Sequence, residues 1–419
     1  MKIITVNKKD KILKGRLKLP SSKSLSNRLL VIQALSNEKF RIKNLSEADD
    51  TLLLQDLLQE IRSKSSYHSF VELDSANAGT VMRFLTAYLT LVPGKWILTG
   101  SDRMKQRPIG VLVEALRSLG AEIEFLGKLG YPPLMIKGKP LKGGEIKVDA
   151  GISSQFISAL LLIAPGLPGG LSIILQGQTV SFPYINMTLR LLNYFGVETG
   201  KEKNKIIIPE TNINGKEFVV EADWSAASFW YEAAALADEA DLVLEGLQKD
   251  SLQGDSILAD IFQNFGVMSE FLKNGVRLTK GKKRLDGFYF DFTDYPDIAP
   301  AVITTCAALG LHGRFEGLKT LRLKETNRFL ALENEYKKLG LHLDSGSPSD
   351  LLSLIEFSNP KIKSNNETRI ETYGDHRMAM TFAPLSVKLG SIKIENPDVV
   401  SKSYPQFWKD LSLLGFEII

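Results

Sequence analysis

A helical pattern that ends in a bulky apolar residue and a glycine, followed by a short alternating strand pattern, recurs along this chain. Glycine suits the junction because it adopts, without steric cost, the left-handed conformation that ends many helices. A sixth segment, 52–63, has the helical pattern without the glycine. Three segments precede about residue 222 and three follow it, which predicts two similar halves built from a repeated helix–strand module. The five glycine junctions lie in 112–126, 187–200, 258–272, 333–344 and 408–419.

Helix–glycine–strand junctions also occur in ordinary α/β proteins, but five copies with the same junction favour a true repeat. The strands expected between the helices, such as 145–150, 171–177 and 288–292, are short and alternate apolar with polar residues. Such strands form mixed sheets with one face on the core. The predicted fold class is therefore α/β, or α+β where helices and strands segregate.

Charge and length narrow the possible functions. The chain has 419 residues, a length that suits two or three domains. Lys and Arg number 52 and Asp and Glu 48, giving a formal net charge of only +4. This balance is too even for a non-specific nucleic-acid binder, which concentrates basic residues on one face. We expect no nucleic-acid partner.

Several features predict a cytoplasmic protein without membrane association. Cys306 is the one cysteine, so a disulfide within the chain is impossible, and its apolar surroundings indicate a core position. The N-terminus lacks the apolar core of a signal peptide. The longest apolar stretch, 159–171, is broken by Pro and Gly and is too short to span a membrane. The four histidines show no ligand spacing, so we predict no metal.

In the first half, hydroxyl, amide and basic side chains gather where helices are expected to begin. Free backbone N–H groups at such positions can bind a phosphate or a carboxylate. At each place a plain capped helix, a tight turn or a solvated basic face is the alternative. The segment 75–85 fits neither the dinucleotide fingerprint nor a P-loop. The candidate residues are Lys23, Ser24 and Arg28; Asn77, Gly79 and Thr80; Arg107; Ser153, Ser154 and Gln155; Ser181 and Tyr184.

In the second half, carboxylates accompany the basic residues. Asp297 precedes an almost wholly apolar helix, either as a helix cap or as a buried functional carboxylate. Lys324 and Arg328 are spaced to share one helical face, where like charges repel unless an anion or Glu325 lies between them. His376 and Arg377 open an apolar helix, and Lys402 precedes another.

Eight motifs carry a resemblance over about 390 residues. In order, SSKSLSNR, NAGTVMR, DRMKQRPIGVLVEALRSLGA, ISSQFISALL, YPDIAPA, LKETNR, GDHRMAM and KSYPQF resemble the 5-enolpyruvylshikimate-3-phosphate synthase family. The resemblance implies two similar domains, each of three βαβαββ units around buried helices, in an inside-out α/β barrel. It implies an active site in the interdomain cleft. The expected domains are 18–222 and a C-terminal domain of 1–17 plus 223–419.

The resemblance also implies a reaction and residue roles. Family members transfer the enolpyruvyl group of phosphoenolpyruvate to the 5-hydroxyl of shikimate 3-phosphate and release phosphate, with no cofactor. We therefore expect small-molecule substrates and a monomer. The implied catalytic residues are Asp297, Glu325 and Lys23. Shikimate 3-phosphate is assigned to Lys23, Ser24, Arg28, Ser153, Ser154, Gln155, Ser181, Tyr184, Asp297 and Lys324. Phosphoenolpyruvate is assigned to Lys23, Asn77, Gly79, Thr80, Arg107, Gln155, Glu325, Arg328, His376, Arg377 and Lys402.

The chain departs from the family pattern at Ala76, Phe84 and Thr320, where Gly, Pro and Asn are common. Gly79 predicts a pocket sensitive to the inhibitor glyphosate, and Phe84 predicts an altered sensitivity. Two alternatives remain. A related enzyme transfers enolpyruvyl to UDP-N-acetylglucosamine, but it normally carries a cysteine in the loop that corresponds to 100–110. A non-catalytic binding protein for phosphorylated metabolites has no need of both Asp297 and Glu325.

Overall fold

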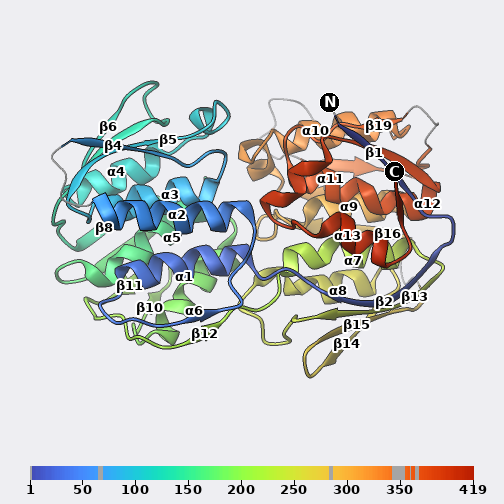
Figure 1. Ribbon diagram of the computed structural model, residues 1–419, viewed down its shortest axis with the longest axis horizontal. Coiled ribbons are helices and arrows are strands. Elements are labelled where there is room, and N and C mark those ends of the chain that lie inside the picture. The colour runs from blue at the N-terminus through green and yellow to red at the C-terminus, as the bar shows by residue number, and fades with distance from the viewer. Residues whose placement is uncertain (1, 65–68, 283–285, 342–353, 359, 364–367) are drawn as a thin grey trace. The chain divides into compact units, whose positions relative to one another are not determined.

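The computed structural model describes residues 2–64, 69–282, 286–341, 354–358, 360–363 and 368–419 (Figure 1). The chain divides into two compact units. Unit 1 consists of Met1–Ser22 and Glu221–Ile419, and unit 2 consists of Lys23–Val220. The domain boundaries expected from the sequence, at 17/18 and 222/223, lie a few residues from these limits and stay a prediction.

Unit 2 contains two complete βαβαββ modules with one sheet topology. In each sheet the first two strands are parallel, and an antiparallel hairpin is added to the second strand. The strand orders are β4-β5-β7-β6 and β8-β9-β11-β10. The first module comprises β4 (Phe70–Asp74), α3 (Gly79–Leu89), β5 (Gly94–Thr99), α4 (Gly110–Ser118), β6 (Glu122–Phe125) and β7 (Leu134–Gly138). The second comprises β8 (Gly144–Asp149), α5 (Ser154–Ile163), β9 (Leu171–Gln176), α6 (Phe182–Tyr194), β10 (Gly200–Glu202) and β11 (Lys205–Ile208).

The rest of unit 2 carries two helices that matter for the site. Helix α1 (Lys23–Leu35) is followed by β3 (Ile42–Lys43) and α2 (Asp49–Lys64). Strand β12 (Phe218–Val219), near the end of the unit, pairs in parallel with β3. Helix α1 packs against α2, α3 and α5.

Unit 1 repeats the topology with strands taken from the N-terminus of the chain. Strand β2 (Ile12–Lys18) is parallel to β13 (Glu239–Glu245), which also pairs with the β14–β15 hairpin (Val267–Leu272 and Gly275–Lys280). Strand β1 (Ile3–Asn7) lies between β20 (Ser391–Glu395) and β21 (Glu417–Ile418) and is antiparallel to both. Unit 1 is discontinuous in sequence because these two strands complete its sheets.

The remaining elements of unit 1 bear the second set of candidate residues. A three-stranded sheet has the order β16-β17-β18, and β19 extends the sheet of β20. The elements are α7 (Trp224–Leu236), α8 (Leu258–Gln263), β16 (Gly287–Asp291), α9 (Ala299–Ala308), β17 (His312–Glu316), α10 (Arg328–Lys338), β18 (Ile355–Phe357), β19 (Arg369–Ile370), α11 (His376–Phe382), α12 (Ser386–Leu389) and α13 (Phe407–Leu413), with the 3-10 turns η3 (Gly254–Ile257), η4 (Lys319–Leu323) and η6 (Pro397–Lys402).

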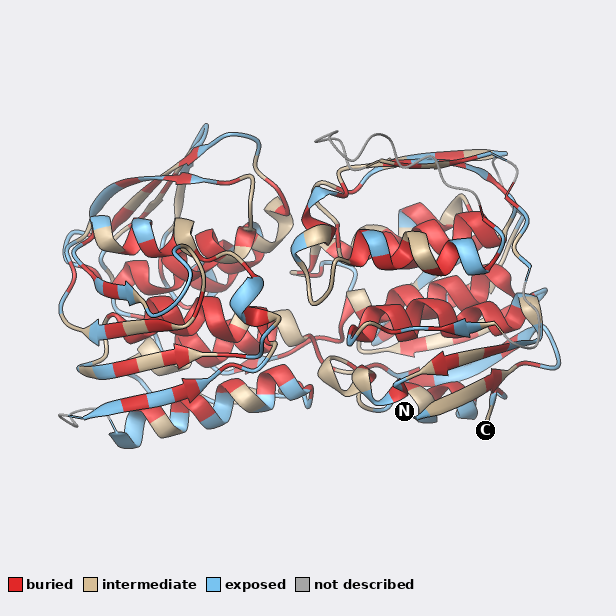
Figure 2. Cartoon of the chain, turned by 90° about the horizontal axis from the view of Figure 1, so that it is seen from above, coloured by how far each residue is buried: buried red, intermediate tan, exposed pale blue. Residues whose placement is uncertain are grey.

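The core of each unit is formed by helices that are buried on every side (Figure 2). In unit 2, ten of the eleven residues of α3 and nine of the ten residues of α5 are buried. In unit 1, twelve of the thirteen residues of α7 and all ten residues of α9 are buried. Helices that are apolar all round need such surroundings, whereas amphipathic helices such as α4 cover the outside. This arrangement confirms the predicted two-part α/β fold with buried helices.

The helix–glycine–strand junctions form largely as predicted. Gly120, Gly196, Gly266, Gly340 and Gly415 all have positive φ, between 76° and 97°. Strands begin directly after Gly266 and within two residues of Gly120 and Gly415, but β10 begins only at Gly200. The strand expected after Gly340 falls in 342–344, outside the described residues. The helix predicted over 52–63 extends over Asp49–Lys64.

Cys306 is buried in α9, which confirms its predicted core position. In the described part of the chain, every helix is too short or too polar to cross a membrane.

Candidate active site

The first turn of α1 brings Lys23 against an acidic residue of α2. Lys23 Nζ lies 3.1 Å from Asp50 Oδ2, and the two side chains are 14% and 6% exposed. Ser24, the next residue, is half-buried. A largely desolvated ion pair holds the ammonium group in place. Asp50 was missed in the sequence, where it is one of two acidic residues in the first turn of an ordinary helix.

The guanidinium of Arg28 is buried and hydrogen-bonded to four acceptors of the protein itself. Its side chain is buried, and burial lowers the pKa of its guanidinium to about 10. The guanidinium also faces the ring of Phe84 at 5.4 Å, so this departure from the family pattern forms a cation–π contact. The predicted direct contact of Arg28 with substrate stays a prediction. The guanidinium donates to Thr188 Oγ1, Ser24 O, Ser158 Oγ and Tyr184 O, at 2.8 to 3.2 Å.

The beginning of α3 meets a buried guanidinium. A Cβ atom added to Gly79 would lie 2.7 Å from Nη2 of Arg107 and 2.9 Å from Nη1 of Arg83. Arg107 Nη1 also donates to the carbonyl of Asn77, at 3.3 Å. The structure thus brings Asn77, Gly79 and Arg107 together, and two cations converge on one helix start. Such an arrangement favours an anion.

The serines of α5 and α6 lie at helix starts, as predicted. Ser153 caps α5 by accepting a hydrogen bond from the backbone N–H of Gln155, at 3.3 Å. Ser154 is buried and Gln155 is half-buried. Ser181 precedes α6 with a left-handed backbone, φ 54°, while the carbonyl of Tyr184 accepts from Arg28. The capping bond accounts for Ser153 alone and leaves the roles of the other residues as predictions.

In unit 1, Asp297 lies at the centre of three cations. Its carboxylate is 3.1 Å from Lys324 Nζ, 3.6 Å from Arg328 Nη1 and 3.3 Å from Arg377 Nη2. Burial alone would disfavour the ionised form, but these cations, Arg377 first, hold the pKa of the Asp297 carboxyl well below its usual range. Asp297 is therefore ionised. The N-cap position of α9 belongs to Ile298, so Asp297 fits a functional carboxylate better than a helix cap.

Glu325 and Asp375 share the guanidinium of Arg328. Arg328 Nη2 lies 2.8 Å from Glu325 Oε2, and its Nε and Nη2 donate to the two oxygens of Asp375. Asp375 also caps α11 by accepting from the backbone N–H of Arg377, at 2.9 Å. It therefore positions two of the predicted cations at once. Its place directly before the start of α11 was the sequence signal that could have revealed it.

His376 and Lys402 belong to elements near Asp375. His376 is the first residue of α11 and is buried, with Nδ1 3.7 Å from Asp375 Oδ1. Lys402 ends η6, which packs against α11. The roles of His376 and Lys402 toward phosphoenolpyruvate stay predictions.

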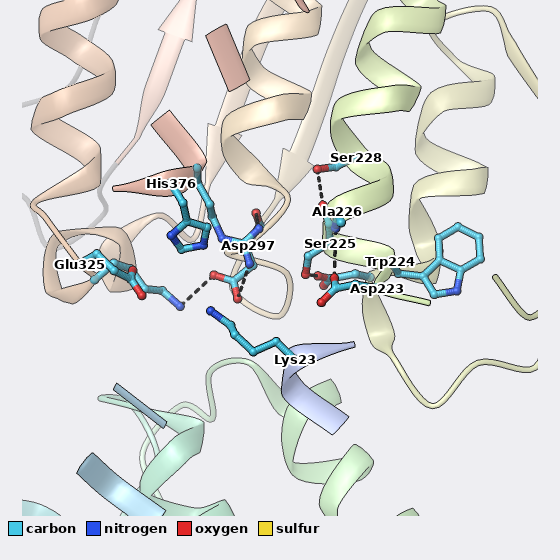
Figure 3. A network of polar contacts seen from close by, with 12 residues as sticks. Lys23, Asp223, Trp224, Ser225, Ala226, Ser228, Asp297, Glu325 and His376 are labelled. Carbon is cyan, nitrogen blue, oxygen red and sulfur yellow. Dashed lines mark hydrogen bonds and ion pairs between the residues drawn. The ribbon is translucent and has the colours of Figure 1, made fainter. Parts of the chain in front are cut away.

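A second buried carboxyl group lies in the electrostatic field of Asp297. Asp255 in η3 accepts a short hydrogen bond from the hydroxyl of Ser225, in the first turn of α7. Burial first, and then the nearby Asp297, raises the pKa of Asp255 to about 6. Figure 3 shows Ser225 beside Asp223, which caps α7. Asp255 was not predicted, because nothing in its local sequence indicates its neighbours.

Fold and site together define a class of protein: a two-unit α/β protein of repeated βαβαββ modules, with buried cations and carboxylates grouped at helix starts. A family model described as EPSP synthase (3-phosphoshikimate 1-carboxyvinyltransferase) matches residues 7–411. This chain belongs to the EPSP synthase family.

Similar proteins support this assignment. A 3-phosphoshikimate 1-carboxyvinyltransferase of Bacteroides fragilis (strain YCH46) is 44% identical over 407 residues, covering 97% of this chain and 96% of that protein. One from Sulfurovum sp. (strain NBC37-1) is 38% identical over 424 residues, covering 96% and 97%. The EPSP synthase structure from Acinetobacter baumannii has a TM-score of 0.77 at 23% identity and covers 100% of this chain and 99% of that chain. The structural likeness supports the fold.

Proposed function

We propose that this chain transfers the enolpyruvyl group of phosphoenolpyruvate to the 5-hydroxyl of shikimate 3-phosphate, giving 5-enolpyruvylshikimate 3-phosphate and phosphate. This is the 3-phosphoshikimate 1-carboxyvinyltransferase reaction of the shikimate pathway, which leads to aromatic amino acids. The observation that carries the proposal is the ionised Asp297 among Lys324, Arg328 and Arg377, with Glu325 on the same guanidinium. Both substrates carry a phosphate and a carboxylate, the groups that such cations bind.

We propose the substrate contacts by unit. In unit 2, the hydroxyl and basic residues of α1, α5 and α6 bind shikimate 3-phosphate, whereas the beginning of α3 and Arg107 bind phosphoenolpyruvate. In unit 1, Asp297 and Lys324 contact shikimate 3-phosphate, and Arg328, Arg377 and Lys402 contact phosphoenolpyruvate. A site in a cleft between two domains stays a prediction from the resemblance.

The proposed mechanism is addition followed by elimination. Asp297 takes the proton of the 5-hydroxyl while the hydroxyl oxygen bonds to C2 of phosphoenolpyruvate. Glu325 gives a proton to the methylene carbon. In the second step the bond from C2 to the phosphate oxygen breaks, and the methyl group returns a proton to the Glu325 carboxylate as the double bond re-forms. The guanidinium groups stabilise the charge on the departing phosphate.

The charges around Asp297 make its proton affinity depend on substrate binding. While three cations surround it, its low pKa makes the carboxylate a weak base. Anionic substrate groups that bind Lys324, Arg328 and Arg377 neutralise this charge and raise the proton affinity of Asp297. Substrate binding therefore makes Asp297 a stronger base.

A coupled phosphate-release assay tests the function. We expect phosphate release from phosphoenolpyruvate with shikimate 3-phosphate and none with UDP-N-acetylglucosamine. Release only with the sugar nucleotide would favour the related transferase. Binding without release would favour the non-catalytic alternative. Residues 100–110 contain no cysteine, and Cys306 is buried in the core helix α9, which disfavours the sugar-nucleotide enzyme.

The substitution Glu325→Gln tests the proton role. Glutamine keeps the size of the side chain and an oxygen for Arg328, so substrate binding should change little. Turnover should fall by roughly 100-fold or more, because proton transfer by a positioned side chain contributes about 10²–10⁴-fold. Steady-state kinetics together with calorimetric binding of shikimate 3-phosphate measures both effects. Normal turnover in this variant would show that Glu325 carries no proton.

A monomeric state and a cytoplasmic location stay predictions from the sequence. Light scattering of the purified protein is the measurement for the first.

A further inference from the structure

A chain of side-chain hydrogen bonds joins the first three helices of unit 2. The Thr51 hydroxyl, on α2, donates to Asn27 Oδ1, on α1, at 2.8 Å. Asn27 Nδ2 then donates to Thr80 Oγ1, on α3, at 2.9 Å. Thr51 and Asn27 are fully buried, whereas Thr80 is half-buried. The chain therefore runs from the core of the unit to a partly accessible hydroxyl.

The direction of donation is the same at both steps. Because Asn27 Oδ1 accepts from Thr51, the amide nitrogen of Asn27 faces Thr80. The oxygen of Thr80 is thereby an acceptor, and its own hydrogen is left to donate. Within the described residues the Thr80 side chain makes no other hydrogen bond. Hydrogen bonds aligned in this way strengthen one another in a buried setting.

The end of this chain of hydrogen bonds adjoins the buried cations at the beginning of α3. Thr80 directly follows Gly79, and a Cβ on Gly79 would lie 2.7 Å from Arg107 Nη2. A hydroxyl hydrogen and a guanidinium are both donors. Donors of this kind complement an anion, and an outward-facing hydroxyl lone pair would repel it.

We propose that Thr51 and Asn27 are positioning residues that turn the Thr80 hydroxyl hydrogen toward the anionic phosphoenolpyruvate. The inference rests on the proposed function. It adds Thr51 and Asn27 to the site, and both act through Thr80. It also explains why an amide stands at residue 27: a carboxylate there would accept from Thr80 and turn its hydrogen inward. The competing explanation is that the three side chains only clamp α1, α2 and α3 together.

The test compares the Michaelis constants for the two substrates. Thr51→Val removes the donor at equal size and should raise KM for phosphoenolpyruvate about 3- to 10-fold, in keeping with the loss of a modest hydrogen bond. KM for shikimate 3-phosphate should stay within about twofold, and Thr51→Ser should restore the wild-type value. Asn27→Asp should raise KM for phosphoenolpyruvate more than Thr51→Val.

A double-mutant cycle separates positioning from clamping. If Thr51 acts through Thr80, Thr51→Val has no further effect on KM in a Thr80→Val background. The matched control is Thr86→Val, which removes another buried hydroxyl of α3, one that donates to Met82 O at 2.7 Å. Urea unfolding of all variants reports the clamping contribution. The control should lose stability and keep its KM.

Wild-type turnover is measured first. Absence of phosphate release overturns the proposed function and the inference with it. Normal wild-type turnover with an unchanged KM in Thr51→Val overturns the inference alone, as does an additive effect of Thr51→Val and Thr80→Val. If Asn27→Asp does not fold, the Thr51 and Thr80 variants still decide.

Discussion

At the scale of single residues, space and charge around Gly79 explain why the beginning of α3 carries no side chain. A methyl group there would press on two guanidinium groups that are both buried, Arg107 and Arg83. The glycine thus allows cations to approach a helix start, where backbone N–H groups are also positive. An anion bound nearby would stabilise that arrangement, as the proposed phosphoenolpyruvate site requires.

Gly79→Ala should displace Arg107 and raise KM for phosphoenolpyruvate by about 10-fold or more, the effect of weakening a charged hydrogen bond. KM for shikimate 3-phosphate should change little. The control is Gly166→Ala in the same unit, where an added Cβ meets no atom within 4 Å. Equal KM values for phosphoenolpyruvate in the two variants would contradict this account.

Asp255 should make stability depend on pH. Its folded-state pKa of about 6 lies above the ordinary value of 3.8, so the folded protein keeps a proton that the unfolded chain releases. Its contribution to stability is fully present below about pH 4 and is lost as the pH rises to about 6. Above that pH the buried charge costs up to about 3 kcal/mol.

Asp255→Asn removes this titration and keeps an oxygen to accept from Ser225. The free energy of unfolding of the variant, relative to the wild type, should therefore rise between about pH 4 and 6. Urea unfolding at intervals from pH 4 to 7 measures it. A difference that is the same at every pH would show that Asp255 keeps its ordinary pKa.

At the scale of elements, a buried polar network holds η6, the turn that carries Lys402. Tyr404, two residues after η6, donates to Asp410 Oδ2 at 2.6 Å and accepts from Trp230 Nε1 at 3.3 Å. These bonds connect the segment that follows η6 to α13 and to the core helix α7. Trp408 on α13 donates to the carbonyl of Pro397, at the other end of η6. A lysine at the end of a mobile turn would be poorly placed, and this network fixes the turn.

Tyr404→Phe should destabilise the protein by about 1–3 kcal/mol, because it leaves buried polar groups of Asp410 and Trp230 without their partner. It should also raise KM for phosphoenolpyruvate if Lys402 binds that substrate. The matched control is Tyr194→Phe, which removes an exposed hydrogen bond to Glu217 O. Urea midpoints and KM values are compared. A loss no larger than that of the control would mean that the network does not hold η6.

At the scale of the whole molecule, the two units differ in how far they depend on distant sequence. Unit 2 is one continuous segment, Lys23–Val220, whereas unit 1 needs Met1–Ser22. Strand β1 pairs with two strands near the C-terminus, and β2 pairs with β13. Without them a sheet of unit 1 loses an inner strand and its hydrogen bonds.

We expect residues 23–220 alone to fold cooperatively and residues 221–419 alone not to do so. Adding residues 1–22 to the second fragment as a peptide should restore part of its structure. Near-ultraviolet circular dichroism and urea unfolding of each fragment provide the measurement. A cooperative transition in 221–419 without the peptide would contradict the expectation.

The sequence by itself determined what is local. The repeated helix–glycine–strand junctions follow from apolar periodicity and the preference of glycine for positive φ, and four of them end in the described strands as predicted or nearly so. The family follows from eight motifs in one order. Many basic and acidic residues of those motifs were visible because they lie at or near an expected helix start, where a phosphate or a carboxylate can bind.

Only the tertiary structure decided which residues meet. The burial of Arg28 among α1, α5 and α6, the position of Asp375 between Arg328 and α11, and the chain from Thr51 to Thr80 join residues far apart in sequence. The pairing of β1 with β20 is of the same kind. Such contacts depend on how helices and strands pack. Apolar periodicity of 3.6 or 2 residues predicts a helix or a strand but does not indicate which element it contacts.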